Sequence, residues 1–242
     1  MPETLLSVRG IHTYYGDSYV LQGLSLEQRA GTIVAILGRN GMGKTTFIRS
    51  VAGLTPPRDG EIRFHGKSLA ALPPYAIAQS GIALVPQGRR IFRSLSVREN
   101  LLLPTSGLAR PRAGRWNLEA VLGQFPQLAE RIQHPGGALS GGEQQMLAVG
   151  RALMANPDLI LMDEPSEGLS PKLVQQVEGI MKSMREHGHA VLLVEQNFAL
   201  AMAVADYIHV VSAGRFVFEG TPAELQNAPE VLDQHLGVAR AH

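Results

Sequence analysis

The chain has 242 residues and a formal net charge of +1, from 22 basic and 21 acidic side chains. This balance gives no general electrostatic attraction to nucleic acid, and the lack of cysteine excludes disulfides, thiolate metal sites and a cysteine nucleophile. Hydrophobic residues make up 45%, which suffices for the core of one large α/β unit or of two domains. The longest apolar runs, such as Ile33–Leu37, are far shorter than the roughly 18 residues of a membrane-spanning helix, and we expect no secretory signal.

The N-terminal part alternates apolar and polar residues. Residues 6–11 (LSVRGI) and 61–64 (EIRF) follow this pattern. Alternation is typical of strands with one buried and one exposed face. These segments therefore predict a small antiparallel sheet.

Continuous apolar, β-branched runs predict a second and larger sheet. They are residues 32–37, 82–85, 159–162 and 190–194. Strands that are apolar on both faces are typical of a parallel sheet covered by helices, and segments with helical spacing lie between the runs. The segment 94–137 has weak strand signals, many helix formers and several prolines, so we expect a helical subdomain inserted between strands.

The first motif follows the run at 32–37. Residues 38–45 (GRNGMGKT) match G-x-x-x-x-G-K-[ST] between a predicted strand and a predicted helix. Its glycines let several backbone N–H groups point at one anion, next to the positive end of the helix. Lys44 would add a charge near the β- and γ-phosphates, and Thr45 a hydroxyl for Mg²⁺. The predicted phosphate-binding residues are Gly38, Arg39, Asn40, Gly41, Met42, Gly43, Lys44, Thr45 and Thr46.

A cluster of positive charge lies further along the chain. Seven arginines fall between Arg89 and Arg115, against the single acid Glu99. A solvated surface explains such a run, and so does a face that meets a partner or lipid headgroups.

The segment 139–145 (LSGGEQQ) predicts the start of a helix. Ser140 and Glu143 have the spacing of a capping box. The same residues, with Gly141 and Gly142, also expose a helix N-terminus to which an anion can bind. The two interpretations are compatible.

Two carboxylates, Asp163 and Glu164, end the apolar run at 159–162. Ligands of open α/β sheets bind at this edge. Because adjacent residues on a strand point in opposite directions, we expect different roles for the two acids. Asp163 suits Mg²⁺, whereas Glu164 suits orientation and activation of the attacking water.

Together these motifs resemble the ATP-binding subunit of ABC transporters over essentially the whole chain. Residues 85–92 (VPQGRRIF), 140–148 (SGGEQQMLA) and 194–197 (VEQN) are most similar to the second ATPase of branched-chain amino-acid importers, the LivF type. The ATPases of urea and amide importers are close relatives. The resemblance implies a P-loop NTPase with a parallel core sheet, a small antiparallel β-subdomain and a helical subdomain inserted at about residues 91–150 of a single nucleotide-binding domain, 1–242.

The resemblance also implies roles for individual residues. Tyr15 would stack on adenine, although a packed core tyrosine is the alternative. Gln87 would touch Mg²⁺ or the water, so that Mg²⁺ is held by Thr45, Gln87 and Asp163. Ser140, Gly141 and Gly142 would grip the γ-phosphate of ATP bound to the opposite subunit. The catalytic residues would be Glu164, Gln196 and Gln87.

Two positions depart from the family pattern. Gln196 stands where the family usually has the histidine of L-L-V-T-H-D. Residues 167–170 (EGLS) lack the aspartate of the usual S-A-L-D, which puts the usual contact across the dimer in doubt.

The resemblance finally implies a function: Mg²⁺-dependent ATP hydrolysis that energises an importer, with branched-chain amino acids as the expected cargo. We expect a second ABC ATPase subunit as partner, in a heterodimer or else a homodimer, together with transmembrane permease subunits and a separate substrate-binding protein. The chain would then lie at the cytoplasmic face of the inner membrane and bind no nucleic acid. The alternatives are a urea or amide importer, a soluble ABC ATPase acting on nucleic acid or ribosomes, and a nucleotide-binding subunit without turnover.

Overall fold

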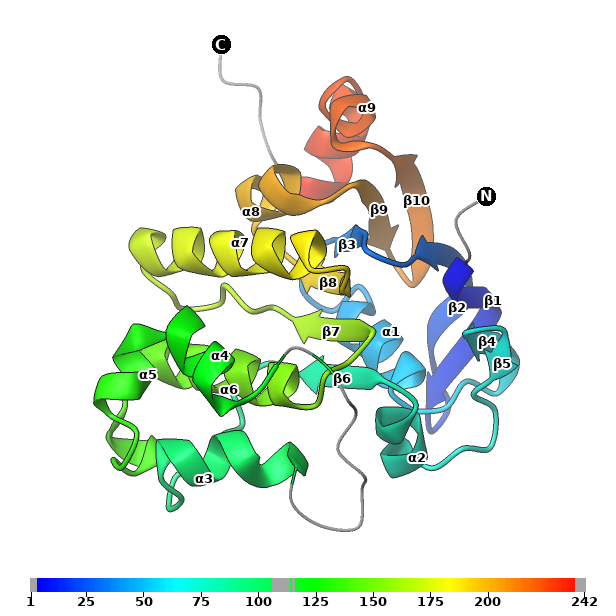
Figure 1. The fold of residues 1–242 in the computed structure, drawn as a ribbon. Helices are drawn as coiled ribbons and strands as arrows, with labels where there is room; N and C mark the ends of the chain where they lie inside the picture. The colour runs from blue at the N-terminus through cyan, green and yellow to red at the C-terminus, as the bar shows by residue number, and fades with distance from the viewer. Residues whose placement is uncertain (1–3, 106–113, 115, 238–242) are drawn as a thin grey trace.

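The computed structural model describes residues 4–105, 114 and 116–237, which form two β-sheets and the helices around them (Figure 1). The strands are β1 (Thr4–Tyr15), β2 (Ser18–Arg29), β3 (Ile33–Leu37), β4 (Asp59–Phe64), β5 (Lys67–Ser68), β6 (Ile82–Val85), β7 (Leu159–Asp163), β8 (Ala190–Glu195), β9 (Tyr207–Ser212) and β10 (Arg215–Gly220). The helices are α1 (Lys44–Val51), α2 (Pro74–Gln79), α3 (Val97–Leu102), α4 (Leu118–Gln124), α5 (Pro126–Glu130), α6 (Gly141–Met154), α7 (Pro171–Glu186), α8 (Phe198–Val204), α9 (Pro222–Gln226) and α10 (Pro229–Val231). Short helical turns are η1 (Leu103–Thr105), η2 (Gly136–Ala138) and η3 (Leu232–Leu236).

The larger sheet has the strand order β10-β9-β3-β8-β7-β6. Its neighbouring strands pair in parallel, except that β10 runs antiparallel to β9. The four strands predicted from apolar runs are β3, β6, β7 and β8, so the predicted parallel core sheet is confirmed. Because parallel strands end at one edge of a sheet, the loops after these four strands lie next to one another.

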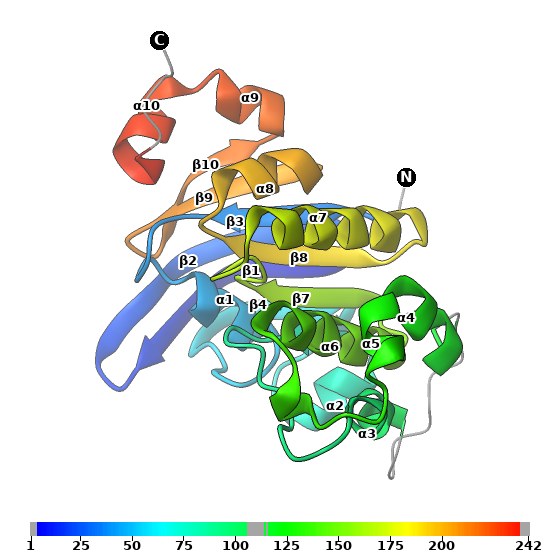
Figure 2. The same ribbon diagram turned by 90° about the vertical axis from the view of Figure 1, so that its left-hand side faces the viewer.

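Alternate residues of the central strands enter two separate cores. Ala35 and Leu193 pack with α6, α7 and α8, whereas Ile36 and Val194 pack with α1 and the smaller sheet. Figure 2 shows α6, α7 and α8 on one side of the large sheet, with α1 and the antiparallel strands behind it. Both faces are covered, which explains the continuous apolar sequence of these strands.

The smaller sheet is antiparallel, with the order β2-β1-β4-β5. It confirms the interpretation of the alternating N-terminal segments, which form parts of β1 and β4. The two strands meet at a bulge, where Gly60 has φ +92°. A Cβ on Gly60 would lie 2.3 Å from the Gly10 carbonyl oxygen, so only glycine fits this close approach.

The chain between β6 and β7 is helical, as its composition predicted. Ser96 and Glu99 cap α3 with a reciprocal pair of side-chain to backbone hydrogen bonds. The buried Asn100 ties this helix to the preceding loop, since its amide donates to the Phe92 carbonyl and accepts from the Phe92 N–H. A boundary for this insertion at about residues 91–150 stays a prediction.

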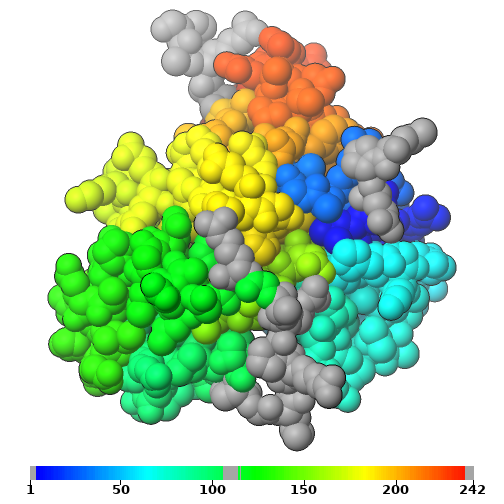
Figure 3. Space-filling model, in the orientation of Figure 1, coloured from blue at the N-terminus to red at the C-terminus, as the bar shows by residue number. Residues whose placement is uncertain are grey.

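The C-terminal part adds the β9–β10 hairpin, which the apolar runs had not singled out. Exposure alternates along β10, which is the edge of the sheet, whereas residues 208–211 of β9 are all buried. In the space-filling view the segment from α9 to η3 stands above the core (Figure 3). Among the described residues, no helix combines the length and apolarity that crossing a membrane requires.

A histidine is buried in this hairpin. His209 on β9 is 2% exposed and packs between the rings of Tyr207 and Phe216. Neither of its ring nitrogens has a hydrogen-bond partner within the described part of the chain; the exposed Glu219 carboxylate is 3.7 Å from Nδ1. Burial lowers the pKa of His209 to about 4.

This burial predicts a loss of stability in acid. Between pH 6.5 and about 4 the unfolded histidine binds a proton that the folded one does not, so His209 lowers the free energy of unfolding by about 3 kcal/mol as the pH falls through that window. The variant His209→Phe lacks this term, and we expect its advantage over the parent protein to grow as the pH decreases. Urea unfolding of both proteins at pH 7.5, 6 and 5 measures the difference. A constant difference across the three pH values would contradict the prediction.

Candidate functional site

The phosphate loop joins the end of β3 to the first residue of α1. Gly43 adopts φ +103° directly before the helix, a backbone conformation that suits glycine. The loop borders a cleft of about 230 Å³. The residues that line it are Val20, Asn40, Gly41, Gly43, Lys44, Thr45, Thr46, Gln87 and Glu164. The structure therefore brings predicted residues from three separate motifs to one cleft.

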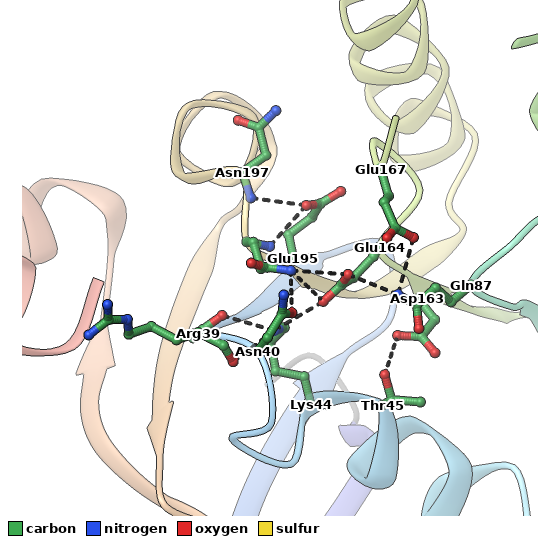
Figure 4. Close-up of polar contacts among 12 residues, drawn as sticks. Arg39, Asn40, Lys44, Thr45, Gln87, Asp163, Glu164, Glu167, Glu195 and Asn197 are labelled. Carbon is green, nitrogen blue, oxygen red and sulfur yellow. Dashed lines mark hydrogen bonds and ion pairs between the residues drawn. The ribbon is translucent and has the colours of Figure 1, made fainter. Parts of the chain in front are cut away.

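Lys44 is buried at the floor of this site. Its Nζ donates to the carbonyl oxygens of Gly38 at 2.9 Å and Arg39 at 3.1 Å. It also forms an ion pair with Glu164 Oε1 at 3.0 Å, and the side chains of both partners are nearly inaccessible to solvent. Figure 4 shows Lys44 below the Glu164 carboxylate, and the Asp163 carboxylate facing Thr45. A buried ammonium is tolerated here because a counter-charge and two carbonyls surround it.

Asp163 is the last residue of β7 and faces the first turn of α1. Its Oδ1 accepts a hydrogen bond from Thr45 Oγ1 at 3.0 Å. Burial raises the pKa of Asp163 above its ordinary value, and the neighbouring Glu164 carboxylate raises it further, against the hydrogen bond from Thr45. Burial thus disfavours the charged form of Asp163.

These oxygens fit a magnesium ion. A threonine hydroxyl and a carboxylate lie in contact, and the Gln87 side chain adds an amide at the same edge. Hard cations such as Mg²⁺ prefer oxygen ligands, and a cation would also relieve the cost of burying the Asp163 charge. The predicted set of Thr45, Gln87 and Asp163 is chemically suited to Mg²⁺.

Glu164 has an unusual backbone. Its φ is +48°, and its N–H donates to the Val194 carbonyl at 2.9 Å. The left-handed conformation turns the chain away from the strand just past Asp163. The two acids have different partners, Thr45 for Asp163 and Lys44 for Glu164, and their different roles stay a prediction. The physical reason for the different partners lies in this turn of the backbone, since the strand that would alternate their directions ends at Asp163.

Two amide side chains complete the surroundings of Glu164. Gln87 Nε2 donates to Glu164 Oε2 at 3.2 Å. Gln196 Nε2 lies 3.3 Å from both carboxylate oxygens and also donates to Asn40 Oδ1 of the phosphate loop. Gln196 thus links the loop after β8 with the phosphate loop, from the position at which the family usually has histidine.

Tyr15 lies at the end of β1, beside α1. The residue is 45% exposed, and its hydroxyl is 3.3 Å from Thr55 Oγ1. Burial raises the pKa of Tyr15, but hydrogen bonds from Thr55 and Thr46 outweigh it, so the net shift is downward. This exposure excludes a fully packed core tyrosine, and stacking of the ring on adenine stays a prediction.

Ser140, Gly141 and Gly142 lie at the N-terminus of α6, away from the phosphate-loop cleft. Ser140 caps α6 and forms a capping box with Glu143, as the spacing predicted. None of the three lines the phosphate-loop cleft formed by the described residues. Ser140 is exposed at the helix N-terminus, where it could meet another molecule.

The arginine cluster divides in the structure. The Arg89 guanidinium lies against the first residue of α6, because a Cβ added to Gly141 would be only 2.7 Å from Arg89 Nη1. The carbonyl of the exposed Arg90 accepts from Arg151 Nη2 at 2.9 Å. Arg93 is exposed and Arg98 is exposed on α3, whereas Arg110, Arg112 and Arg115 fall outside the described residues.

Two acidic residues at the site were not among the predicted site residues. Glu167 Oε2 accepts from Gln87 Nε2 at 3.1 Å. Glu195, the last residue of β8, is 2% exposed. The signal for Glu195 was a carboxylate at the end of an otherwise apolar strand, directly before Gln196.

Comparisons with known proteins agree with this geometry. The family described as ABC transporter matches residues 21–167. The high-affinity branched-chain amino acid transport ATP-binding protein BraG of Pseudomonas aeruginosa is 42% identical over 234 residues, covering 96% of this chain and 100% of BraG. The probable branched-chain amino acid transport ATP-binding protein LivF of Archaeoglobus fulgidus is 33% identical over 212 residues, covering 87% of this chain and 89% of that protein.

A solved structure extends the agreement to the fold. The crystal structure of the ADP conformation of MJ1267, an ATP-binding cassette of an ABC transporter, matches with a TM-score of 0.84 at 25% identity, over 96% of this chain and 98% of that one. The predicted P-loop fold, with its parallel core sheet and antiparallel subdomain, is therefore confirmed. The chain belongs to the ABC transporter family and is one of its nucleotide-binding ATPases.

Proposed function

We propose that this chain is the Mg²⁺-dependent ATPase subunit of an importer for branched-chain amino acids. It works as one half of a pair with a second ABC ATPase subunit, as a heterodimer or else a homodimer. Transmembrane permease subunits hold the pair at the cytoplasmic face of the membrane, and a separate binding protein delivers the cargo. The importer class rests on the similarity to BraG and LivF, whose names specify branched-chain amino acid transport.

One observation carries the catalytic part of the proposal. A single buried carboxylate, Glu164, is touched by Lys44, Gln87 and Gln196, which come from the loops after β3, β6 and β8. A purely structural nucleotide-binding subunit has no need for a carboxylate in this place. A base at the centre of a phosphate site is what hydrolysis of ATP requires.

The proposed mechanism follows from the positions of these groups. The N–H groups of the phosphate loop, the N-terminus of α1 and Lys44 bind the phosphates, which draws the Lys44 ammonium away from Glu164. Glu164 then orients a water and takes its proton as the water oxygen attacks the γ-phosphorus, and the bond to ADP breaks. Thr45, Asp163 and Gln87 would hold Mg²⁺, which neutralises charge on the phosphate oxygens.

The remaining roles concern the pair of subunits. Ser140, Gly141 and Gly142 would bind the γ-phosphate of the nucleotide on the opposite subunit, because they lie at an exposed helix N-terminus away from their own phosphate loop. Tyr15 would stack on the adenine. Closing of the pair around ATP and its opening after hydrolysis would then move the permease.

Replacement of the proposed base tests the function directly. We expect Glu164→Gln to bind ATP, because the amide keeps the shape and releases Lys44, but to reduce turnover by roughly 10²–10⁴-fold. ATP should then hold two ATPase subunits together. In vesicles that contain the assembled transporter, uptake of labelled leucine should be ATP-dependent with the parent chain and absent with Glu164→Gln. Parent-like turnover in the variant would refute the base, and uptake of urea or an amide in place of leucine would refute the cargo.

The buried ion pair predicts an effect on stability. Lys44→Ala leaves the Glu164 carboxylate without its counter-charge, and we expect the free energy of unfolding without nucleotide to fall by up to roughly 3–5 kcal/mol. The double variant Lys44→Ala, Glu164→Gln should recover most of this loss, because a neutral amide needs no cation. Urea unfolding at pH 7.5 measures both. Equal destabilisation in the single and double variants would mean that Lys44 acts through packing alone.

Replacement of Gln196 should affect the rate of ATP hydrolysis and the affinity for ATP to different extents. Its amide can donate to the γ-phosphate but cannot titrate, so Gln196→Ala should slow turnover by more than it weakens ATP binding. Gln196→His should retain much of the activity and add a pH dependence near neutrality. Turnover of the three forms at saturating Mg-ATP, from pH 6 to 9 in the assembled complex, makes the comparison. Parent-like turnover of Gln196→Ala would make the residue a bystander.

A further inference from the structure

The strand β8 ends in a buried carboxylate that the mechanism above does not use. Glu195 is 2% exposed, although the preceding residues of the strand are all apolar. No basic side chain pairs with it among the described residues. A buried charge without a counter-ion is costly unless hydrogen bonds replace its water shell.

Backbone donors provide those hydrogen bonds. Glu195 Oε1 accepts from the Ser166 N–H at 2.9 Å. Glu195 Oε2 accepts from the N–H groups of Gln196 and Asn197, each at 3.0 Å. Both oxygens act only as acceptors, which is the pattern of an ionised carboxylate, and such charge-assisted bonds are stronger than neutral ones.

The donors belong to two different loops. Ser166 lies in the loop after β7, between Glu164 and Glu167, whereas Gln196 and Asn197 begin the loop after β8. Oε1 accepts from the loop after β7, and Oε2 accepts from the loop after β8. Both oxygens belong to one rigid, planar carboxylate. Figure 4 shows Glu195 beside Glu164, with its bond to the Asn197 N–H. A displacement of one loop must therefore move the other or break a buried hydrogen bond.

The two loops carry the groups that surround the γ-phosphate site. One holds Glu164 and also Glu167, which contacts Gln87. The other holds Gln196, which contacts Glu164 and Asn40. We propose that Glu195 is a positioning residue for ATP hydrolysis, which couples the loop after β7 to Gln196 so that Gln196 and Glu164 keep their mutual geometry. This inference rests on the proposed ATPase function, and it assigns the two departures from the family pattern, Gln196 and the loop 167–170, to one linked unit.

Two substitutions of Glu195 distinguish the effect of its negative charge from the effect of its contacts with both loops. In Glu195→Gln the amide nitrogen faces backbone N–H donors, so one loop loses its acceptor. In Glu195→Asp the charge remains, but the side chain is one methylene shorter and cannot span both loops. We expect each variant to lower kcat by roughly 10- to 100-fold in the assembled transporter, because small misplacements of catalytic groups have effects of this size. Affinity for a non-hydrolysable ATP analogue should change by less than about threefold, since the phosphate loop itself is intact.

A control variant weakens another carboxylate to backbone hydrogen bond, at an exposed residue away from the site. Asp206 Oδ2 accepts from the Ile33 N–H at 2.8 Å, at the opposite edge of the sheet. Asp206→Asn weakens this contact and also removes the ion pair of Asp206 Oδ1 with Arg185 Nη1 at 3.0 Å. Neither contact touches the site, so we expect parent-like kcat per folded molecule. A loss of kcat in Asp206→Asn equal to that in the Glu195 variants would overturn the proposal in favour of general destabilisation.

A double-mutant cycle tests the route of the effect. If Glu195 acts through Gln196, then Glu195→Gln combined with Gln196→Ala should be about as slow as Gln196→Ala alone. If the kcat losses of the two single variants multiply in the double variant, the proposed route through Gln196 is overturned. Parent-like kcat in both Glu195 variants would overturn the positioning role. Should Glu195→Gln not fold, Glu195→Asp carries the same cycle. A parent protein without ATP hydrolysis would instead refute the proposed function, so the two failures are distinguishable.

Discussion

The contact between the Lys44 ammonium and the Glu164 carboxylate determines how the site is built. Both groups are buried, and charges at 3.0 Å in such surroundings are tolerable only when each is paired and hydrogen-bonded. Lys44 is held by two carbonyls of its own loop, and Glu164 by two amide side chains. The pair thus requires that the loops after β3 and β7 remain at a fixed separation.

The parallel sheet meets that requirement. β3 and β7 lie on either side of β8, and β6 follows β7 in the same sheet, so the loops after all four strands share one edge. The strands are covered on both faces by apolar side chains, which leaves little freedom for one strand to shift against another. Glu164 consequently receives contacts from the loops that follow three other strands. A ligand that attracts the Lys44 ammonium therefore removes the counter-charge of Glu164.

The unusual residues of this chain form a connected arrangement. Gln196 replaces a titratable histidine with a neutral amide donor, and Glu167 stands in a loop that lacks the usual aspartate. Glu195 lies between the two segments and accepts hydrogen bonds from both. Positions that looked like separate departures in the sequence are thus neighbours in space. In the proposed mechanism the proton-accepting role falls on Glu164, because the amide side chains around it cannot accept a proton near neutral pH.

The sequence by itself determined the features whose chemistry is local. The glycine-rich loop with Lys44, the capping box at Ser140 and the apolar strand before Asp163 each span a few residues, and hydrophobic periodicity was sufficient for the core strands. The tertiary structure alone decided that Gln87 contacts Glu167, that Arg89 lies on Gly141, and that Glu195 bridges two loops. These contacts join residues that are distant along the chain, and they depend on the order of strands in the sheet and on the left-handed turn at Glu164. Neither the strand order nor the conformation of Glu164 leaves a periodic pattern in the sequence, because each depends on contacts between residues that are distant along the chain.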